Sequence, residues 1–129
     1  MLSCDQQQGD PVVQFEEDNP EMSAAIEEAR QSLATFISHL EEDPTDETAL
    51  IKAPIDTGSQ VEHIWVGNLQ FDGQQFTGQF ANEPFDLSRY KQGDTVSVPQ
   101  ADISDWAFID GNEMIGGYTI KVMEKRMTE

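Results

Sequence analysis

The chain has 129 residues, the usual size of one domain, and a formal net charge of −18 that arises from 25 acidic and 7 basic side chains. This composition excludes the clustered Lys and Arg residues that bind nucleic acid or an anionic membrane surface. No run of about 18 apolar residues is present that would form a transmembrane segment.

Residues 1–18 are polar and predict a flexible tail, which leaves residues 19–129 as a single folded domain. The tail contains the one cysteine of the chain, Cys4, so no intramolecular disulfide forms. Leu2-Ser3-Cys4 is similar to the end of a lipoprotein processing site, with a polar tether after it. This interpretation places the protein in the periplasm or anchored to a membrane by a lipid on Cys4. The alternative is a frayed terminus with a free thiol in a cytoplasmic protein.

One long helix is predicted over residues 20–42. Asn19 is a suitable N-cap, Pro20 fits the first helical position, and Pro44 prevents continuation. Apolar residues recur at spacings of three and four, which indicates one buried face. These residues are Met22, Ala25, Ile26, Ala29, Leu33, Phe36, Ile37 and Leu40.

Five strand-like segments follow, at residues 50–53, 61–71, 76–81, 95–98 and 105–109. We expect Pro54 to stop the first segment or to place it at an edge. Asp72-Gly73 predicts a hairpin turn. Gly67 and Gly78 lie inside strands, which is typical of bends or bulges in a curved sheet.

The last segment, residues 114–127, is compatible with a strand or with a short closing helix. The predicted fold class is therefore α+β. It consists of one long N-terminal amphipathic helix packed on a strongly bent, mostly antiparallel sheet of about five strands. A more specific form of this prediction is that the sheet closes into a small, partly open barrel. A short C-terminal helix or strand completes it.

Three stretches carry a family resemblance that covers the chain from Asn19 onward. They are residues 20–36, then residues 62–66 with Gly73, Gly78 and 82–84, then residues 93–94, 103–106 and 117–119. In this order they resemble the bacterial domain-of-unknown-function family DUF 2314. The resemblance implies no specific activity. It implies secreted or lipid-anchored members, which fits a lipid on Cys4. By analogy between classes of protein, other small acidic domains serve as immunity partners of bacterial toxins.

His63 is the candidate general base, and catalysis would also need a nucleophile and an orienting group. Ser104 and Thr119 are the candidate hydroxyl groups, and Glu62 or Asp105 could orient the ring. The structural alternative is that His63 packs on the same face as neighbouring strand residues with its nitrogens hydrogen-bonded. Glu62, His63 and Asp105 are therefore weak catalytic candidates.

Both tryptophans stand close to one of these acids. Trp65 and Trp106 are candidate binding residues together with Glu62 and Asp105, because aromatic side chains are favoured interface anchors. A core position is the alternative for either tryptophan. The histidines at positions 39 and 63 show no ligand spacing, so we expect no metal and no cofactor.

These observations favour a non-catalytic acidic binding protein, such as an immunity or inhibitor protein that docks on a basic effector or enzyme. The alternatives are a small hydrolase-like enzyme centred on His63 and an envelope lipoprotein of structural or stress-related role. The acidic surface alternatively serves solubility alone. An unpaired sheet edge would also allow a homodimer, and the sequence does not decide this.

Overall fold

The computed structural model describes residues 19–127. The predicted tail and the proposed lipidation site at Cys4 lie outside these residues. Within them, no helix combines the length and the apolar character needed to cross a membrane.

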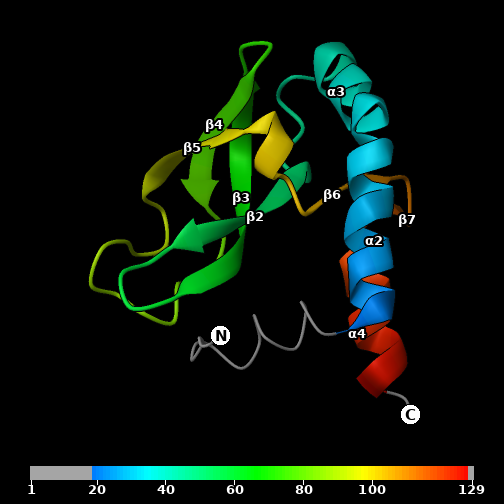
Figure 1. Cartoon of the computed structure of the whole chain (residues 1–129). Helices are drawn as coiled ribbons and strands as arrows, with labels where there is room; N and C mark the ends of the chain where they lie inside the picture. The colour runs from blue at the N-terminus through cyan, green and yellow to red at the C-terminus, as the bar shows by residue number, and fades with distance from the viewer. Residues whose placement is uncertain (1–18, 128–129) are drawn as a thin grey trace.

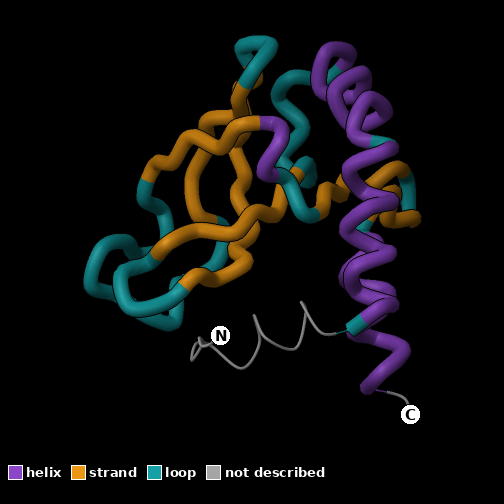
Figure 2. The backbone as a smooth tube through the Cα atoms, in the orientation of Figure 1, coloured by secondary structure: helices purple, strands orange, loops and turns teal. Residues whose placement is uncertain are grey.

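The helical region begins as predicted, but it is not one continuous helix. Asn19 caps α2 (Pro20–Gln31), since its side-chain oxygen accepts hydrogen bonds from the amides of Glu21 and Met22. A break at Ser32 separates α2 from α3 (Leu33–Glu42). The Ser32 hydroxyl donates to the carbonyl of residue 28, a contact that bends helices, and also bonds the hydroxyl of Tyr118. The two helices stay in one column, with the short interruption visible in the tube (Figures 1 and 2).

The sheet is antiparallel and open. Its order is β5-β4-β3-β2-β6-β7, with β5 and β7 at the edges. The strands are β2 (Leu50–Asp56), β3 (Val61–Phe71), β4 (Gln75–Phe80), β5 (Thr95–Pro99), β6 (Asp105–Asp110) and β7 (Glu113–Gly116). The sixth strand, β7, was not predicted as a separate element, because it falls in the last segment, for which the sequence left strand and helix open. That segment contains both a strand and a helix, α4 (Tyr118–Met127). A short 3₁₀ helix, η1 (Gln100–Asp102), precedes β6.

The two glycines predicted to mark bends or bulges have different roles, a bulge at Gly67 and a close approach of the backbones at Gly78. The register of β3 and β4 shifts between Gly67 and Gln70, which is the bulge expected near Gly67. A Cβ atom on Gly78 would lie 2.3 Å from the carbonyl oxygen of Gly67, so the two strands approach closely there. β2 continues through Pro54, because its pairing with β6 ends at Lys52 and only β3 pairs beyond it.

The core lies between α3 and the curved sheet. Phe36 on α3 is fully buried, and its ring centroid lies 5.5 Å from that of Trp106 and 6.0 Å from that of Phe76. On β3 the buried side chains alternate with more exposed ones. The even-numbered positions 62, 64 and 66 therefore face inward, and positions 61, 63 and 65 form the outer face.

Candidate functional site

The three weak catalytic candidates are held by different parts of the fold. Glu62 and His63 are neighbours on β3, so their side chains leave opposite faces of the sheet. Glu62 is buried, whereas His63 lies half-buried on the outer face. Asp105 lies on β6, where it is completely buried. Glu62 is therefore not placed to orient the His63 ring.

His63 faces the hydroxyl group of Ser104, with 3.2 Å between Nδ1 and Oγ. Burial, followed by the positive charges of Lys52 and Arg30, lowers the pKa of His63 to about 4. The ring is therefore neutral near pH 7. A neutral imidazole beside a hydroxyl is the arrangement of a base and a nucleophile. However, Ser104 is 1% exposed and its hydroxyl also donates to the Lys52 carbonyl at 3.2 Å. This burial favours a packing role.

Asp105 connects β6 to the start of α4. Its carboxylate accepts hydrogen bonds from the backbone amides of Trp106, Tyr118 and Thr119 at 2.8, 3.1 and 2.9 Å. The hydroxyl of Thr119 also donates to it. Lys52 Nζ donates to this hydroxyl at 3.2 Å. The carboxylate is thus fully used in holding a helix terminus.

The two tryptophans lie in different environments. Trp106 is 1% exposed, packs in the core, and donates its indole N–H to the carbonyl of Ala29 at 3.0 Å. It therefore takes no part in a surface binding platform. Trp65 is half-buried on the outer face of β3, and Lys52 Nζ lies 5.7 Å from its ring centroid. Trp65 is the tryptophan that solvent reaches.

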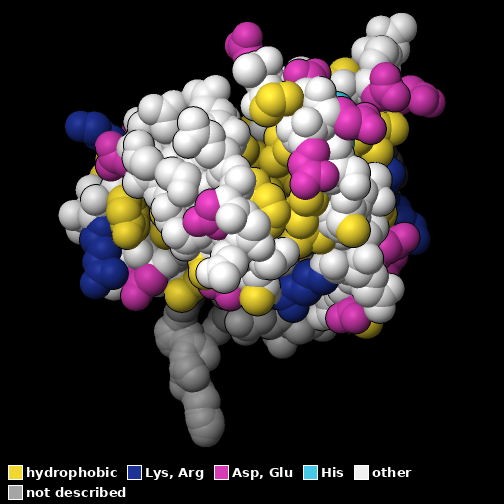
Figure 3. Space-filling view, turned by 90° about the horizontal axis from the view of Figure 1, so that it is seen from above, with side chains coloured by type: hydrophobic (Ala, Val, Ile, Leu, Met, Phe, Trp, Pro, Cys, Tyr) yellow, Lys and Arg dark blue, Asp and Glu magenta, His cyan; other side chains and the backbone are white. Residues whose placement is uncertain are grey.

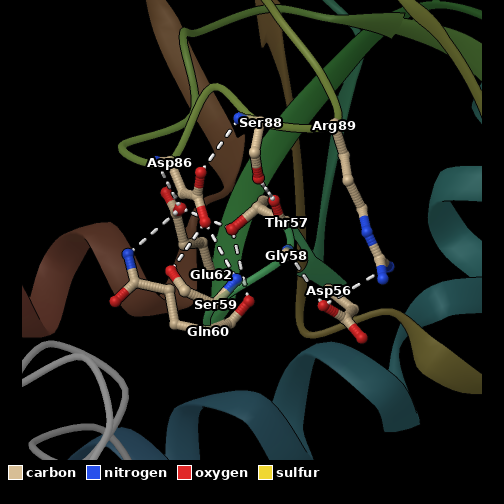
Figure 4. A network of polar contacts seen from close by, with 9 residues as sticks. All are labelled: Asp56, Thr57, Gly58, Ser59, Gln60, Glu62, Asp86, Ser88 and Arg89. Atoms are coloured by element: carbon tan, nitrogen blue, oxygen red, sulfur yellow. Dashed lines mark hydrogen bonds and ion pairs between the residues drawn. The ribbon is translucent and has the colours of Figure 1, made fainter.

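Glu62 holds the loop between β4 and β5 against the turn between β2 and β3 (Figure 4). Its carboxylate accepts hydrogen bonds from Thr57 Oγ1 at 2.7 Å, Phe85 N at 2.6 Å, Asp86 N at 3.0 Å and Gln60 Nε2 at 3.2 Å. Burial acts to raise the pKa of Glu62, but these donors outweigh it and lower the pKa. We call this set the loop latch.

Asp86 forms the second half of the loop latch. Its carboxylate accepts hydrogen bonds from the hydroxyl and amide of Ser59 at 2.6 and 2.8 Å and from the amide of Ser88 at 2.9 Å. These bonds, chiefly that from the Ser59 hydroxyl, hold the pKa of Asp86 well below its usual range. The latched loop displays two hydrophobic side chains, Phe85 at 87% and Leu87 at 56% exposure.

Five carboxylates gather at the C-terminal end of α3, and we call this group the acidic end. Residues 31–51 contain no Lys or Arg. The last turn of α3 and its C-cap lie within this group, where the helix dipole already places partial negative charge. The members are Glu41, Glu42, Asp43, Asp46 and Glu47.

The acidic end is fixed by one histidine. His39 Nε2 lies 2.7 Å from Asp46 Oδ2, and the His39 ring stacks on Phe108 with 3.7 Å between centroids. Burial of Asp46 acts to raise its pKa, but the hydrogen bonds from His39 and Thr48 outweigh it and lower the pKa. His39, Asp43 and Asp46 offer ligand atoms within 4.8 Å of one another, a spacing that could hold a metal ion. In the present arrangement the contact between His39 and Asp46 fastens the following loop to α3.

An apolar cleft of about 530 Å³ lies beside the acidic end, between α3 and the β3–β4 hairpin. Figure 3 shows hydrophobic side chains at the surface of this end of the molecule, with carboxylates beside them. We call it the α3–hairpin cleft. It is lined by Ile37, Leu40, Glu41, Pro44, Thr45, Leu69, Gln70, Phe71 and Gly73.

Comparison with known proteins assigns the family. A family model described as an uncharacterized protein conserved in bacteria (DUF2314) matches residues 19–129. The chain belongs to the DUF2314 family. The match covers every element of this DUF2314 domain, from the N-cap of α2 to the end of α4.

Two relatives show this similarity over most of the chain. "Putative ankyrin repeat protein NMB1133/NMB1171" of Neisseria meningitidis is 34% identical over 94% of this chain and 52% of its own length. The chain therefore spans about half of that relative. "Uncharacterized protein YegJ" of Escherichia coli is 33% identical over 80% of this chain and 67% of its own length. No solved structure is significantly similar to the chain.

Sequence reasoning missed several polar residues of this DUF2314 domain. Lys52 is 8% exposed. It is the one charged residue among the apolar residues 50–55 of β2, and this was the available signal that it has a partner. Thr57 and the amides of the loop latch had no comparable signal, because they meet Glu62 only through the fold. The cleft also joins residues about 30 positions apart, which no local pattern connects.

Proposed function

We propose that this DUF2314 domain is a non-catalytic binding protein whose acidic end docks on a basic protein partner. The observation that carries this proposal is the concentration of carboxylates at the C-terminus of α3, in a stretch without Lys or Arg. Inhibition of a basic effector or enzyme, as by an immunity protein, is the specific form of docking that we propose.

The position of these carboxylates argues for a role beyond solubility. Glu41 and Glu42 lie in the last turn of α3, where the helix dipole disfavours negative charge by about 0.3–1 kcal/mol for each group. Side chains that serve solubility alone would act equally well elsewhere on the surface. Retention of a local cost to stability is typical of functional surfaces.

An acidic surface of this kind contributes to the binding of a basic partner in two ways. It accelerates the encounter with a positively charged partner, and it disfavours acidic competitors. A protein partner is also in keeping with the name of the Neisseria meningitidis relative, since ankyrin repeats present extended binding surfaces. The burial of the Ser104 hydroxyl weakens the competing proposal of a hydrolase centred on His63.

The test compares two variants that lose the same charge at different places. The acidic-end variant combines Glu41→Gln, Glu42→Gln, Asp43→Asn and Glu47→Gln. The control variant combines exposed positions elsewhere, Glu27→Gln, Glu28→Gln, Asp102→Asn and Glu124→Gln. Both are used, beside the wild type, to capture proteins from bacterial extracts at about 50 and 300 mM salt, followed by mass spectrometry.

We expect the wild type and the control variant to retain a basic protein at low salt and to lose it at high salt. The acidic-end variant should retain little of it. Equal recovery by the two variants, or recovery that salt does not change, would contradict docking through the acidic end.

A further inference from the structure

We infer that the α3–hairpin cleft receives one large apolar side chain of the basic partner, and that carboxylates at its rim bind Lys or Arg residues beside that anchor. This inference rests on the proposed function and specifies its partner as a segment in which a hydrophobic residue is flanked by cations.

The floor of the cleft is apolar and suited to one anchor residue. Leu40 and Leu69 are buried at 6% and 7% exposure, and Ile37 and Phe71 are half-buried beside them. A volume of about 530 Å³ lies within the range of sites that enclose small ligands. Large apolar or aromatic side chains that enter such pockets dominate the affinity of many interfaces.

The rim of the cleft determines the charge of the occupant. Glu41 lines the cleft directly, and Asp72 lies between two lining residues at the tip of the hairpin. Residues 31–51 and 53–88, which supply both walls, contain no Lys or Arg. A purely apolar or acidic ligand would leave the negative charge of the rim carboxylates uncompensated, whereas flanking cations complement it.

Both walls are held in place without a ligand. Phe71 stacks on Phe76 with 4.4 Å between ring centroids. The Asp72 carboxylate accepts hydrogen bonds from the amides of Gln74 and Gln75, each at 2.9 Å, which fixes the hairpin turn. On the other wall, the His39 contact with Asp46 fixes the loop after α3. A preformed cleft lowers the ordering cost of binding.

The test uses the full chain and two short synthetic Lys-rich peptides of equal charge. One carries a central Trp and the other a central Ser at the same position. Their affinities are measured by fluorescence anisotropy at about 50 mM and 300 mM NaCl. We expect the Trp peptide to bind the wild type at least about tenfold more tightly than the Ser peptide.

Cleft-filling substitutions provide the control. Thr45→Trp and Gln70→Trp each place a large ring at an exposed lining position of the cleft. Either substitution should reduce the affinity of the Trp peptide to that of the Ser peptide. Thr95→Trp makes the same change at an exposed position outside the cleft. Thr95 is the first residue of β5 and pairs with Gln79, whereas the last residue of β5 pairs with Gln75 beside the hairpin turn. This variant should preserve the difference in affinity between the two peptides. Thermal unfolding of each variant identifies which of the two cleft variants is folded and can be used.

The outcomes separate the two proposals. If neither peptide shows salt-sensitive binding, both the cleft inference and docking of basic partners fail. If both peptides bind equally and with salt dependence, only the cleft inference fails. It also fails if the Trp preference survives in a folded cleft variant.

Discussion

Asp105 binds Thr119 twice, through the backbone amide and through the side-chain hydroxyl. One carboxylate on β6 thereby fixes the first turn of α4, and it also accepts the amide of Tyr118 at 3.1 Å. The glycine turn before α4, at Gly116 and Gly117, has positive φ values of 82° and 67°, which allow the chain to reverse there. The start of the C-terminal helix is set by these two features together.

Replacement of Asp105 should therefore destabilise the domain. We expect Asp105→Asn to lower the free energy of unfolding by about 2–3 kcal/mol, because buried amide and hydroxyl donors lose a charged acceptor. Urea unfolding followed by circular dichroism measures this change. Asp110→Asn, at an exposed position of the same strand, should alter it by less than about 0.5 kcal/mol. Equal effects of the two substitutions would refute the capping role.

The loop latch predicts local rather than global effects. In Glu62→Gln the amides of Phe85 and Asp86 no longer each have a carboxylate oxygen, because they bond Oε1 and Oε2 respectively. One of these positions becomes a neutral amide oxygen and the other an NH2 donor. We expect the amides of these two residues to exchange with solvent about tenfold faster, corresponding to about 1.4 kcal/mol. Hydrogen exchange followed by NMR measures this, with Glu83→Gln in the same loop as the control.

The latch should also respond to acid. The pKa of Glu62 is lowered from 4.5 in the folded state, so its contribution to stability is present above that value. The contribution is lost as the pH falls through the lower, folded-state pKa. Protection factors of the Phe85 and Asp86 amides, which correct the exchange rates for their intrinsic dependence on pH, should fall through this acid range. Constant protection factors would argue against the latch.

His63 predicts a pH dependence in a different range. Its pKa is about 4 in the folded protein and near 6.5 when unfolded, so the unfolded state binds the proton more readily. Stability from the neutral ring is present above about pH 6.5 and falls, by about 2–3 kcal/mol, as the pH decreases to about 4. His63→Gln should remove this component. Urea unfolding of both proteins across this range would show parallel curves if the prediction is wrong.

The elements with strong local signals were predictable from the sequence. Asn19 and Pro20 mark the start of α2, and the predicted strand at residues 61–71 coincides with β3. The break at Ser32 was not predictable, because it involves Tyr118, 86 positions further along the chain. Strand β7 is only four residues long and depends on pairing with β6.

The candidate site was harder to predict from the sequence, because the register of the strands decides on which face of the sheet each of its side chains lies. Each tryptophan follows one of the two candidate acids, Glu62 three positions before Trp65 and Asp105 directly before Trp106. In the sheet, Trp65 pairs with Lys52 and Trp106 with Ile51, which are adjacent residues of β2 that face opposite sides. The same alternation separates Glu62 from His63. Pairing partners, which lie far apart in sequence, therefore decide which side chains meet.

The acidic end leads to opposite expectations for stability and binding. Glu41→Gln and Glu42→Gln should each raise the free energy of unfolding by about 0.3–1 kcal/mol, because the last turn of α3 loses an unfavourable charge. The same substitutions should weaken binding of a Lys-rich peptide, most clearly at low salt. Thermal unfolding and anisotropy on the same samples measure both effects. Glu27→Gln, in the middle of α2, is the matched control and should leave peptide binding unchanged. If the charges at positions 41 and 42 only kept the protein soluble, their removal would stabilise α3 without any loss of peptide affinity.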